Sequence, residues 1–312
     1  MQQQPQPQPE RYSAPRMITP LSVPALREAG QFKFPLDQPA LNALVRAALE
    51  EDGAFNDITT IATVVTERRA RASLMAKQAG VLAGVPLAVE TFRLLDPKVS
   101  IRVDAEDGTH VKPGDSVLFM TGHARPILAA ERVALNFMQR LSGVASLTAR
   151  YVEAVKGTKA RILDTRKTTP GWRLLEKYAV RAGGGTNHRF DLASAVLIKD
   201  NHLAALDGDI SMAVRRARET AAPGTRVEVE CDRRDQVEAA VRAGADIIML
   251  DNMTPEAMRD CVSLVGGQAI VEASGGVTLS SVRAIAETGV DWISVGAITH
   301  SAPAMDLAVE FE

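Results

Sequence analysis

The sequence predicts an α/β protein made of an N-terminal α+β domain followed by a β/α barrel. Up to Leu141, segments with strand character come in succession and are followed by helices. From Ala160 onward, short apolar runs alternate with helical segments, and nearly every run ends in a polar or charged residue. Strand–helix alternation on this scale implies parallel strands joined by right-handed crossovers.

The N-terminal part begins with a helix and continues with strands. Apolar residues at helical spacing predict the first helix over Leu36 to Glu51. Three β-rich segments follow, separated by glycines and a Lys-Pro-Gly-Asp turn: Arg69 to Val85, Ser100 to Asp104 and Ser116 to Thr121. Two helices are predicted next, over Pro126 to Leu141 and Val144 to Lys156. We therefore expect the first domain to end near Leu141.

The second part contains six strand-like runs. They are Arg161–Leu163, Val196–Ile198, Val227–Val229, Ile247–Leu250, Ala269–Val271 and Trp292–Val295. The helices between them have recognisable starts, with Thr254 and Thr278 as predicted N-cap residues. Because a full barrel has eight such units, either two escape this pattern or the barrel is incomplete.

The polar residues at the ends of these runs favour a barrel over an open doubly wound sheet. In a β/α barrel the carboxyl ends of all strands converge on one mouth, where the active site is built. In an open sheet only the strands at a switch point converge. The residues that close the runs are Asp164, Thr165, Arg166, Lys199, Asp200, Glu230, Asp251, Glu272, Ser274 and Gly296.

A basic cluster lies in residues 161–199, where eight Lys or Arg stand against three Asp or Glu. Such a cluster is commonly a solvated helix face. Here, however, the cations follow strands or glycines at the predicted mouth: Arg166, Lys167, His188, Arg189 and Lys199. Cations so placed suit a polyanionic ligand, because arginine offers a planar fork to carboxylate or phosphate.

Two carboxylates complement this cluster. Glu230 and Asp251 each terminate an apolar strand, where an unpaired charge is costly. They could pair with the nearby lysines, or they could hold sugar hydroxyls and Mg²⁺, the usual counter-ion of substrate phosphates. We favour the second interpretation because the residues form a set on separate strands.

A second anion site is predicted at Glu272-Ala273-Ser274-Gly275-Gly276-Val277. The glycines precede a helix that is expected to begin near Thr278. Free backbone N–H groups and the helix dipole would favour a phosphate there. The position late in the βα series adds weight, since late loops often form the phosphate site of such barrels.

Composition narrows the function classes. A net charge of −2 gives no overall attraction to nucleic acid or an anionic membrane, and the 4% of aromatic residues argues against base-stacking platforms. Cys231 and Cys261 show no metal-ligand spacing, which favours a reducing compartment. The chain has no membrane-length apolar run, and its start, MQQQPQPQPE, lacks signal-peptide features. We expect a cytoplasmic protein with a disordered Gln/Pro-rich tail over residues 1–30.

Long stretches of the sequence resemble the signatures of the quinolinate phosphoribosyltransferases, the carboxylating nicotinate-nucleotide pyrophosphorylases of NAD biosynthesis. The main matches are DTRKTTPGWR (164–173), KYAVRAGGGTNHR (177–189) and IKDNH (198–202). Further matches are EDGAFNDITT (51–60), ERVALNFMQRLSGVAS (131–146), EVEC (228–231), MLDN (249–252), EASGGV (272–277) and ISVGAITHS (293–301). The resemblance extends over the chain except for its first thirty or so residues.

This resemblance implies a homodimer. Each subunit would have an N-terminal α/β sandwich domain (residues 31–141, joined by 300–312) and an open, incomplete β/α barrel of about seven strands (residues 142–299). One of the strands not visible in the pattern is then expected to be short and polar. The implied reaction joins quinolinate to 5-phosphoribosyl-1-pyrophosphate with Mg²⁺, giving nicotinate mononucleotide, CO2 and pyrophosphate.

The resemblance also implies roles for individual residues. The residues expected to face the two carboxylates of quinolinate are Arg166, His188, Arg189 and Lys199, with Arg132 reaching in from the partner subunit. Thr165 is expected to bind substrate and Lys167 to meet the phosphoribosyl donor. The ribose hydroxyls and, directly or indirectly, the metal would be held by Glu230 and Asp251. The 5-phosphate would lie against Ser274, Gly275, Gly276, Val295, Gly296 and Ala297. The expected catalytic residues are Lys167, Lys199, Glu230 and Asp251.

Three other functions compete with this one. A related phosphoribosyltransferase could act on another aromatic acid, although the two arginines and the histidine expected to face carboxylates argue against it. A Schiff-base lyase is a second alternative, because Lys199 at a strand end resembles an aldolase lysine. The dense set of cations around it argues against that chemistry. A non-catalytic sensor of phosphorylated ligands is the third, but a mere binder has little need for Glu230 and Asp251.

Overall fold

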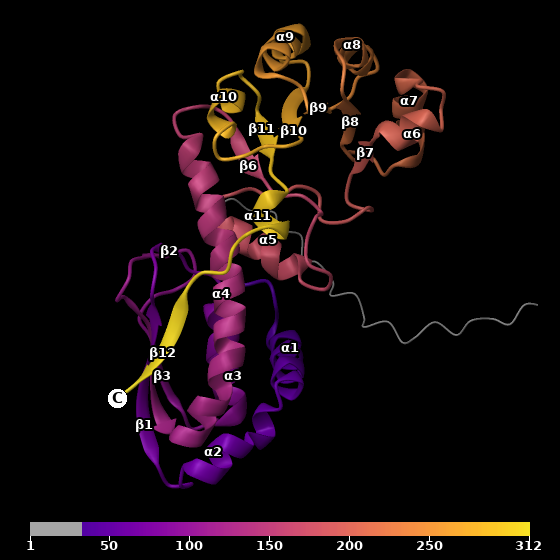
Figure 1. The fold of residues 1–312 in the computed structure, drawn as a ribbon. Helices are drawn as coiled ribbons and strands as arrows, with labels where there is room; N and C mark the ends of the chain where they lie inside the picture. The colour runs from indigo at the N-terminus through magenta and orange to yellow at the C-terminus, as the bar shows by residue number, and fades with distance from the viewer. Residues whose placement is uncertain (1–32) are drawn as a thin grey trace, which may run out of the picture. The chain divides into compact units, whose positions relative to one another are not determined.

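The computed structural model describes residues 33–312, so the tail expected over residues 1–30 lies outside the described residues. An antiparallel sheet and a parallel sheet, each with its own helices, are joined by the long helix α4 (Ala124–Ala154), drawn in magenta in Figure 1. None of the described helices combines the length and the apolar composition that a membrane span requires.

The N-terminal elements form a sheet with helices on it. They are α1 (Gln38–Glu51), η1 (Ala54–Asn56), α2 (Ile58–Thr63), β1 (Arg69–Ala76), β2 (Gly80–Val81), α3 (Val85–Leu95), β3 (Ser100–Val103), β4 (His110–Val111) and β5 (Ser116–His123). The larger sheet has the order β12-β1-β5-β3, while β2 and β4 form a separate two-stranded sheet; all these pairings are antiparallel. The last strand that the structure describes, β12 (Leu307–Phe311), thus pairs with β1, the first described strand. Alternate residues of β1 are buried, as expected for a strand with one face against the core.

Helix α4 is continuous, so the prediction of two helices separated near Ser142 and Gly143 is wrong. The small residues serve close packing instead of a break. A Cβ atom on Gly143 would lie 3.0 Å from the carbonyl carbon of Pro303, so only glycine lets the C-terminal segment cross the helix there. The Ser142 hydroxyl accepts a hydrogen bond from the N–H of Ala83 at 3.0 Å.

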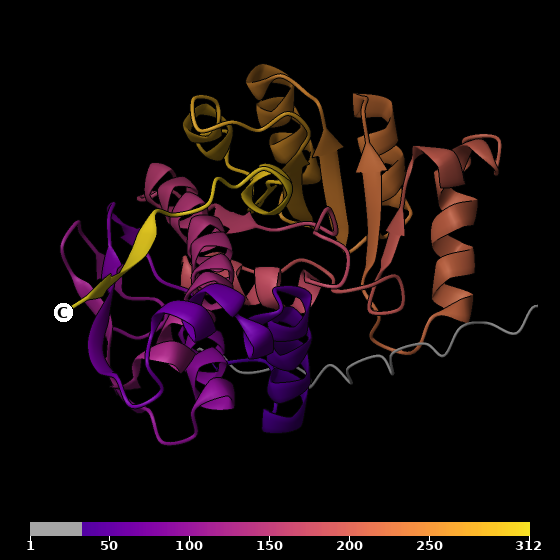
Figure 2. The ribbon, with the colours of Figure 1, turned by 60° about the horizontal axis from the view of Figure 1, so that its bottom comes forward.

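The second half is a parallel sheet wrapped by helices. Its strands are β6 (Arg161–Leu163), β7 (Val196–Ile198), β8 (Val227–Cys231), β9 (Ile247–Asp251), β10 (Ile270–Ser274) and β11 (Trp292–Ser294). Its helices are α5 (Arg173–Ala182), α6 (Asp200–Ala204), α7 (Ile210–Thr220), α8 (Arg234–Arg242), α9 (Pro255–Val265), α10 (Val282–Ala286) and α11 (Ala297–His300). The strand order is β6-β11-β10-β9-β8-β7, with all pairs parallel (Figure 2).

A seventh position of the barrel is reduced to a single residue. Thr186 forms an isolated parallel bridge with Leu163 on β6, and its N–H donates to the carbonyl of Ile162 at 2.9 Å. Thr186 and β7 therefore stand at the two ends of the strand order, and the barrel is open between them. The predicted fold class, an N-terminal α/β domain with an open, incomplete barrel, is confirmed.

The two predicted N-caps have different outcomes. The Thr254 side chain accepts from the N–H of Ala257 and caps α9 as expected. The prediction for Thr278 is wrong, because α10 begins at Val282 and its N-cap position is Ser281. Thr278 instead stabilises the preceding turn, with its hydroxyl accepting from the N–H of Ser281 at 3.2 Å. Helix α10 therefore does not follow the glycines as closely as the predicted anion site assumed.

Candidate active site

A cavity of about 580 Å³ lies at the carboxyl ends of the parallel strands. The predicted site residues that line it are Thr165, Arg166, Lys167, His188, Arg189, Lys199, Glu230, Asp251, Ser274, Gly275 and Gly276. Four further lining residues were not predicted: Leu197, Met249, Asn252 and Ser294. All six strands contribute because parallel strands bring their carboxyl ends to one mouth.

The remaining predicted residues lie outside this lining: Arg132, Val295, Gly296 and Ala297. Gly296 still shapes the site, since a Cβ there would lie 3.2 Å from Cδ of Lys167. The carbonyl of Lys167 also accepts a hydrogen bond from the hydroxyl of Thr299 at 2.7 Å. The start of helix α11 therefore fixes the position of Lys167 through these two contacts. Arg132 is exposed on α4.

Two arginines give the cavity its attraction for anions. Arg166 Nε is buried and has no hydrogen-bond partner among the described residues. Burial lowers the pKa of Arg189, and the neighbouring positive charge of Arg166 lowers it further. Arg189 Nη1 donates to the carbonyl of Ala195 at 3.1 Å, which fixes the direction of its guanidinium. An unpartnered buried guanidinium nitrogen beside a second guanidinium calls for an anionic ligand.

The acidic residues of the mouth differ in their partners. Glu230 forms an ion pair with Lys199, so this pair is neutral before any ligand binds. Asp251 has no ion pair among the described residues, and its Oδ2 accepts a hydrogen bond from Asn252 Nδ2 at 2.7 Å. Because β8 and β9 are neighbours in the sheet, the two carboxylates stand at adjacent strand ends. They form a set of hard oxygen donors of the kind that Mg²⁺ binds.

A buried cluster below the mouth was not predicted. His188 Nε2 lies 3.2 Å from an oxygen of Glu228 and 3.5 Å from an oxygen of Glu272. Barrel interiors are usually filled by branched apolar residues, so two buried carboxylates there are unusual. The signal in the sequence was the alternation Glu-Val-Glu on β8, because residues two apart on a strand point to the same side.

This cluster is arranged to hold a proton. Two carboxylate oxygens lie within 3.5 Å of His188 Nε2, so a hydrogen, not a lone pair, stands on this nitrogen. A divalent metal would need that lone pair, although the three donor atoms lie within 4.8 Å of one another. Burial works against a charged ring, but Glu228 and Glu272 outweigh it and raise the pKa of His188 to about 10. Burial raises the pKa of Glu228 as well.

The cluster predicts a pH dependence of stability. Because the folded pKa of His188, about 10, lies above the unfolded value of 6.5, its contribution is fully present below pH 6.5. We expect the free energy of unfolding to fall as the pH rises from 6.5 towards 10. Urea denaturation across this range measures it. Glu272→Gln removes one of the two carboxylates, so the free energy of unfolding should fall less steeply with pH than in the wild type. An equally steep fall would contradict the role of Glu272 in raising the pKa of His188.

A second buried pair holds the segment that carries His188 and Arg189. Lys177 and Asp164 are both fully buried and form an ion pair. Lys177 Nζ also donates to the carbonyl of His188 at 3.0 Å, and Asp164 accepts from the N–H of His188 at 2.9 Å. Asn187 Nδ2 donates to Asp164 at 2.6 Å. The segment after Thr186 is therefore fixed to β6 and α5 through side chains, because it has little strand pairing of its own.

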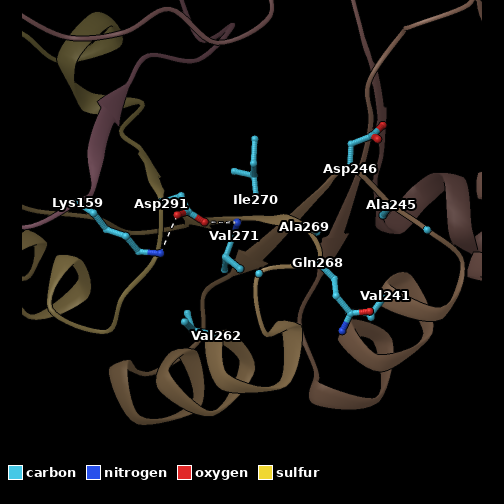
Figure 3. A pocket seen from close by; sticks show the side chains of 12 residues that line it. Lys159, Val241, Ala245, Asp246, Val262, Gln268, Ala269, Ile270, Val271 and Asp291 are labelled. Atoms are coloured by element: carbon cyan, nitrogen blue, oxygen red, sulfur yellow. Dashed lines mark hydrogen bonds and ion pairs between the residues drawn. The ribbon is translucent and has the colours of Figure 1, made fainter.

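Another cavity of about 580 Å³ lies at the opposite ends of the strands (Figure 3). Its acidic groups are engaged in holding strands. Asp291 pairs with Lys159 at 2.7 Å and accepts from the N–H of Val271 at 2.9 Å. Asp246 accepts from the N–H of Val227 at 2.6 Å. Side chains at this end of a barrel serve stability, so the candidate active site is the cavity at the carboxyl ends.

The chain matches known proteins over nearly its whole described length. Residues 57–142 match the family described as quinolinate phosphoribosyl transferase, N-terminal domain, and residues 144–310 match its C-terminal domain. A probable nicotinate-nucleotide pyrophosphorylase [carboxylating] of Bacillus subtilis is 42% identical, covering 86% of this chain and 93% of that protein. A nicotinate-nucleotide pyrophosphorylase [carboxylating] of Mycobacterium leprae is 41% identical, covering 85% and 95%.

Solved structures agree with these sequence matches. The nicotinate-nucleotide pyrophosphorylase from Francisella tularensis is 39% identical and superposes with a TM-score of 0.84, covering 91% of this chain and 100% of that one. A human nicotinic acid phosphoribosyltransferase, 13% identical with a TM-score of 0.52, shares the fold. Two matched domains and relatives at this level of identity confirm the predicted family: the chain belongs to the quinolinate phosphoribosyltransferases.

Proposed function

We propose that the chain transfers the phosphoribosyl group of 5-phosphoribosyl-1-pyrophosphate to quinolinate with loss of CO2, giving nicotinate mononucleotide and pyrophosphate. The observation that carries this proposal is the unpartnered, buried Arg166 Nε beside Arg189, in one cavity with Glu230 and Asp251. A dicarboxylate acceptor and a phosphorylated sugar need both halves of that cavity. Relatives named for this reaction share about 40% of their residues with the chain.

The arginine side of the cavity suits quinolinate. Its two adjacent carboxylates can be bound by the planar forks of Arg166 and Arg189, whose geometry matches carboxylate oxygens. Lys199 would take part once an incoming ligand competes with Glu230 for its ammonium group. Fixing the acceptor in this way turns a bimolecular encounter into a positioned reaction.

The acidic side of the cavity suits the sugar and a metal ion. Glu230 and Asp251 supply the oxygen ligands that Mg²⁺ prefers and would hold it, directly or through water. When bound, Mg²⁺ neutralises charge on the departing pyrophosphate. The Ser274–Gly276 turn and Lys167 line the same cavity, so backbone N–H groups of the turn would bind the 5-phosphate and Lys167 would meet the donor.

The residues present need no covalent intermediate. The sugar carbon becomes positively charged as pyrophosphate departs, and the carboxylates of Glu230 and Asp251 stabilise that charge. After the ring nitrogen is glycosylated it carries a positive charge, which accepts the electron pair released with CO2. The cations that hold the other carboxylate keep the ring in place during this step.

The deciding experiment is incubation of the purified protein with quinolinate, phosphoribosyl pyrophosphate and Mg²⁺, followed by detection of nicotinate mononucleotide and CO2. Activity should disappear when EDTA removes the metal and return when Mg²⁺ is added back. Product from another aromatic acid, with none from quinolinate, would identify a related transferase instead. A borohydride-trapped adduct at Lys199 would identify a Schiff-base lyase.

We also propose a homodimer in which Arg132 completes the site of the partner subunit. In support, Arg132 is exposed on α4 and does not line the cavity of its own chain. Large apolar side chains are exposed nearby on η1 and α2, with Phe55 at 48% and Ile58 at 73%. These elements share a small cavity with Ala129, which lies one helical turn before Arg132 on α4. An exposed apolar patch of this kind is typical of a subunit interface.

The proposed location is the cytoplasm. Cys231 and Cys261 are buried and unpaired, which suits a reducing compartment. Burial raises the pKa of the Cys231 thiol to about 12. That thiol therefore stays protonated and unreactive at neutral pH, and the proposed chemistry does not use it.

A further inference from the structure

Asn252 has an unusual backbone conformation at the edge of the cavity. It follows β9 directly and lines the cavity, and its φ is 54°. Among the described residues that are not glycine, the only other positive φ belongs to Asp207, at 51°. Side chains rarely adopt this left-handed conformation, and when they do at a functional site the surrounding structure holds them there.

The contacts of Asn252 explain what this conformation achieves. Its Nδ2 donates to Oδ2 of Asp251 at 2.7 Å, while its own N–H donates to the carbonyl of Ser274 at 3.0 Å. Its side chain also lies against Gly275, where a Cβ would be 2.5 Å from Cγ of Asn252. One residue thus contacts both the carboxylate proposed to hold the ribose and the turn proposed to hold the 5-phosphate.

We propose that Asn252 is a positioning residue for the phosphoribosyl donor, an inference that rests on the proposed function. The hydrogen bond to Oδ2 fixes the carboxylate plane of Asp251 and leaves Oδ1 for the donor. The packing against Gly275 sets the distance between this carboxylate and the Ser274–Gly276 turn. Since neither contact involves the arginines, Asn252 acts on binding of the donor and not on binding of quinolinate.

The protein offers variants that separate the amide from the backbone strain. Glycine adopts positive φ without steric cost, so Asn252→Gly removes the side-chain amide and can keep the backbone conformation. Asn252→Asp keeps the size of the side chain but cannot donate to Asp251 when ionised. Asp207→Gly is the matched control, because Asp207 has the same backbone conformation in an exposed turn between α6 and α7, away from the cavity.

The test measures binding and turnover separately. In Asn252→Gly we expect KM for phosphoribosyl pyrophosphate to rise roughly tenfold, with KM for quinolinate changed by less than about twofold. Calorimetric titration of phosphoribosyl pyrophosphate with Mg²⁺, without quinolinate, should show the same loss of affinity. Asn252→Asp should lose at least as much as Asn252→Gly although it fills the same space as asparagine. Asp207→Gly should match the wild type in both KM values.

The outcomes distinguish a failure of the proposed transferase activity from a failure of the role proposed for Asn252. If the wild-type protein forms no nicotinate mononucleotide, the proposed function itself fails. If the wild type is active but Asn252→Gly binds the donor normally, only the role of Asn252 is refuted. A parallel rise of both KM values, together with a lower melting temperature than Asp207→Gly, would show a general structural role and would also refute it.

Discussion

Replacing Arg189 by alanine is expected to lower kcat/KM for quinolinate by on the order of a hundredfold or more while the protein stays folded. The variant removes one of two guanidinium forks from the cavity, and a missing charge-assisted contact to a reacting group has effects of this size. Arg189→Lys keeps the charge without the fork, so its activity should lie between those of alanine and wild type.

Steady-state kinetics with varied quinolinate measure this effect, and thermal unfolding checks the fold. Arg216→Ala is a suitable control, because Arg216 is exposed on α7 and does not line the cavity. Near-normal activity of Arg189→Ala would remove this residue from the site. Equal activities of the lysine and alanine variants would show that the planar fork, and not the charge alone, carries the contact.

Mixing Arg132→Ala subunits with Lys199→Ala subunits is expected to restore activity that neither variant has alone. In such a heterodimer one site would combine an intact barrel with the intact Arg132 of the partner, and the other site would carry both lesions. Verified heterodimers should therefore reach about half of the wild-type rate. Differently tagged, co-expressed chains allow the heterodimer to be isolated and assayed.

A second mixture makes this result interpretable. Arg189→Ala and Lys199→Ala both alter residues that line the cavity of their own chain, so a heterodimer of these variants has one lesion in each site. It should stay inactive. Recovery in this mixture would indicate contamination by wild-type protein, while no recovery with Arg132→Ala would argue against Arg132 acting across subunits.

The sequence predicted the parts of the fold that depend on local pattern. All six predicted runs became parallel strands, because short runs rich in branched apolar residues are typical of the buried strands of a barrel. The seventh position has no such stretch, since Thr186 is flanked by Gly185 and Asn187, and the segment after it is held by the side chains of Lys177 and Asp164. The continuity of α4 through Gly143 depends on a segment that crosses it from far along the chain, which no local pattern reveals.

The candidate site shows the same division. Cations and acids at strand ends could be predicted because parallel strands bring those ends together. The cluster of His188, Glu228 and Glu272 required knowledge of which side chains point into the barrel at the same depth. The role proposed for Asn252 depends on a left-handed backbone conformation, which asparagine tolerates but which the sequence alone does not predict.

The position of β12 in the N-terminal sheet has a consequence for how the chain folds during synthesis. Its pairing joins Ala72 to Phe311, so a strand made early waits for a segment that is synthesised after all the described barrel strands. Until then β1 has a bare hydrogen-bonding edge, which is a template for wrong pairing with other chains. The described barrel strands, by contrast, are all synthesised before β12, so the catalytic half can form first and the N-terminal sheet closes after it.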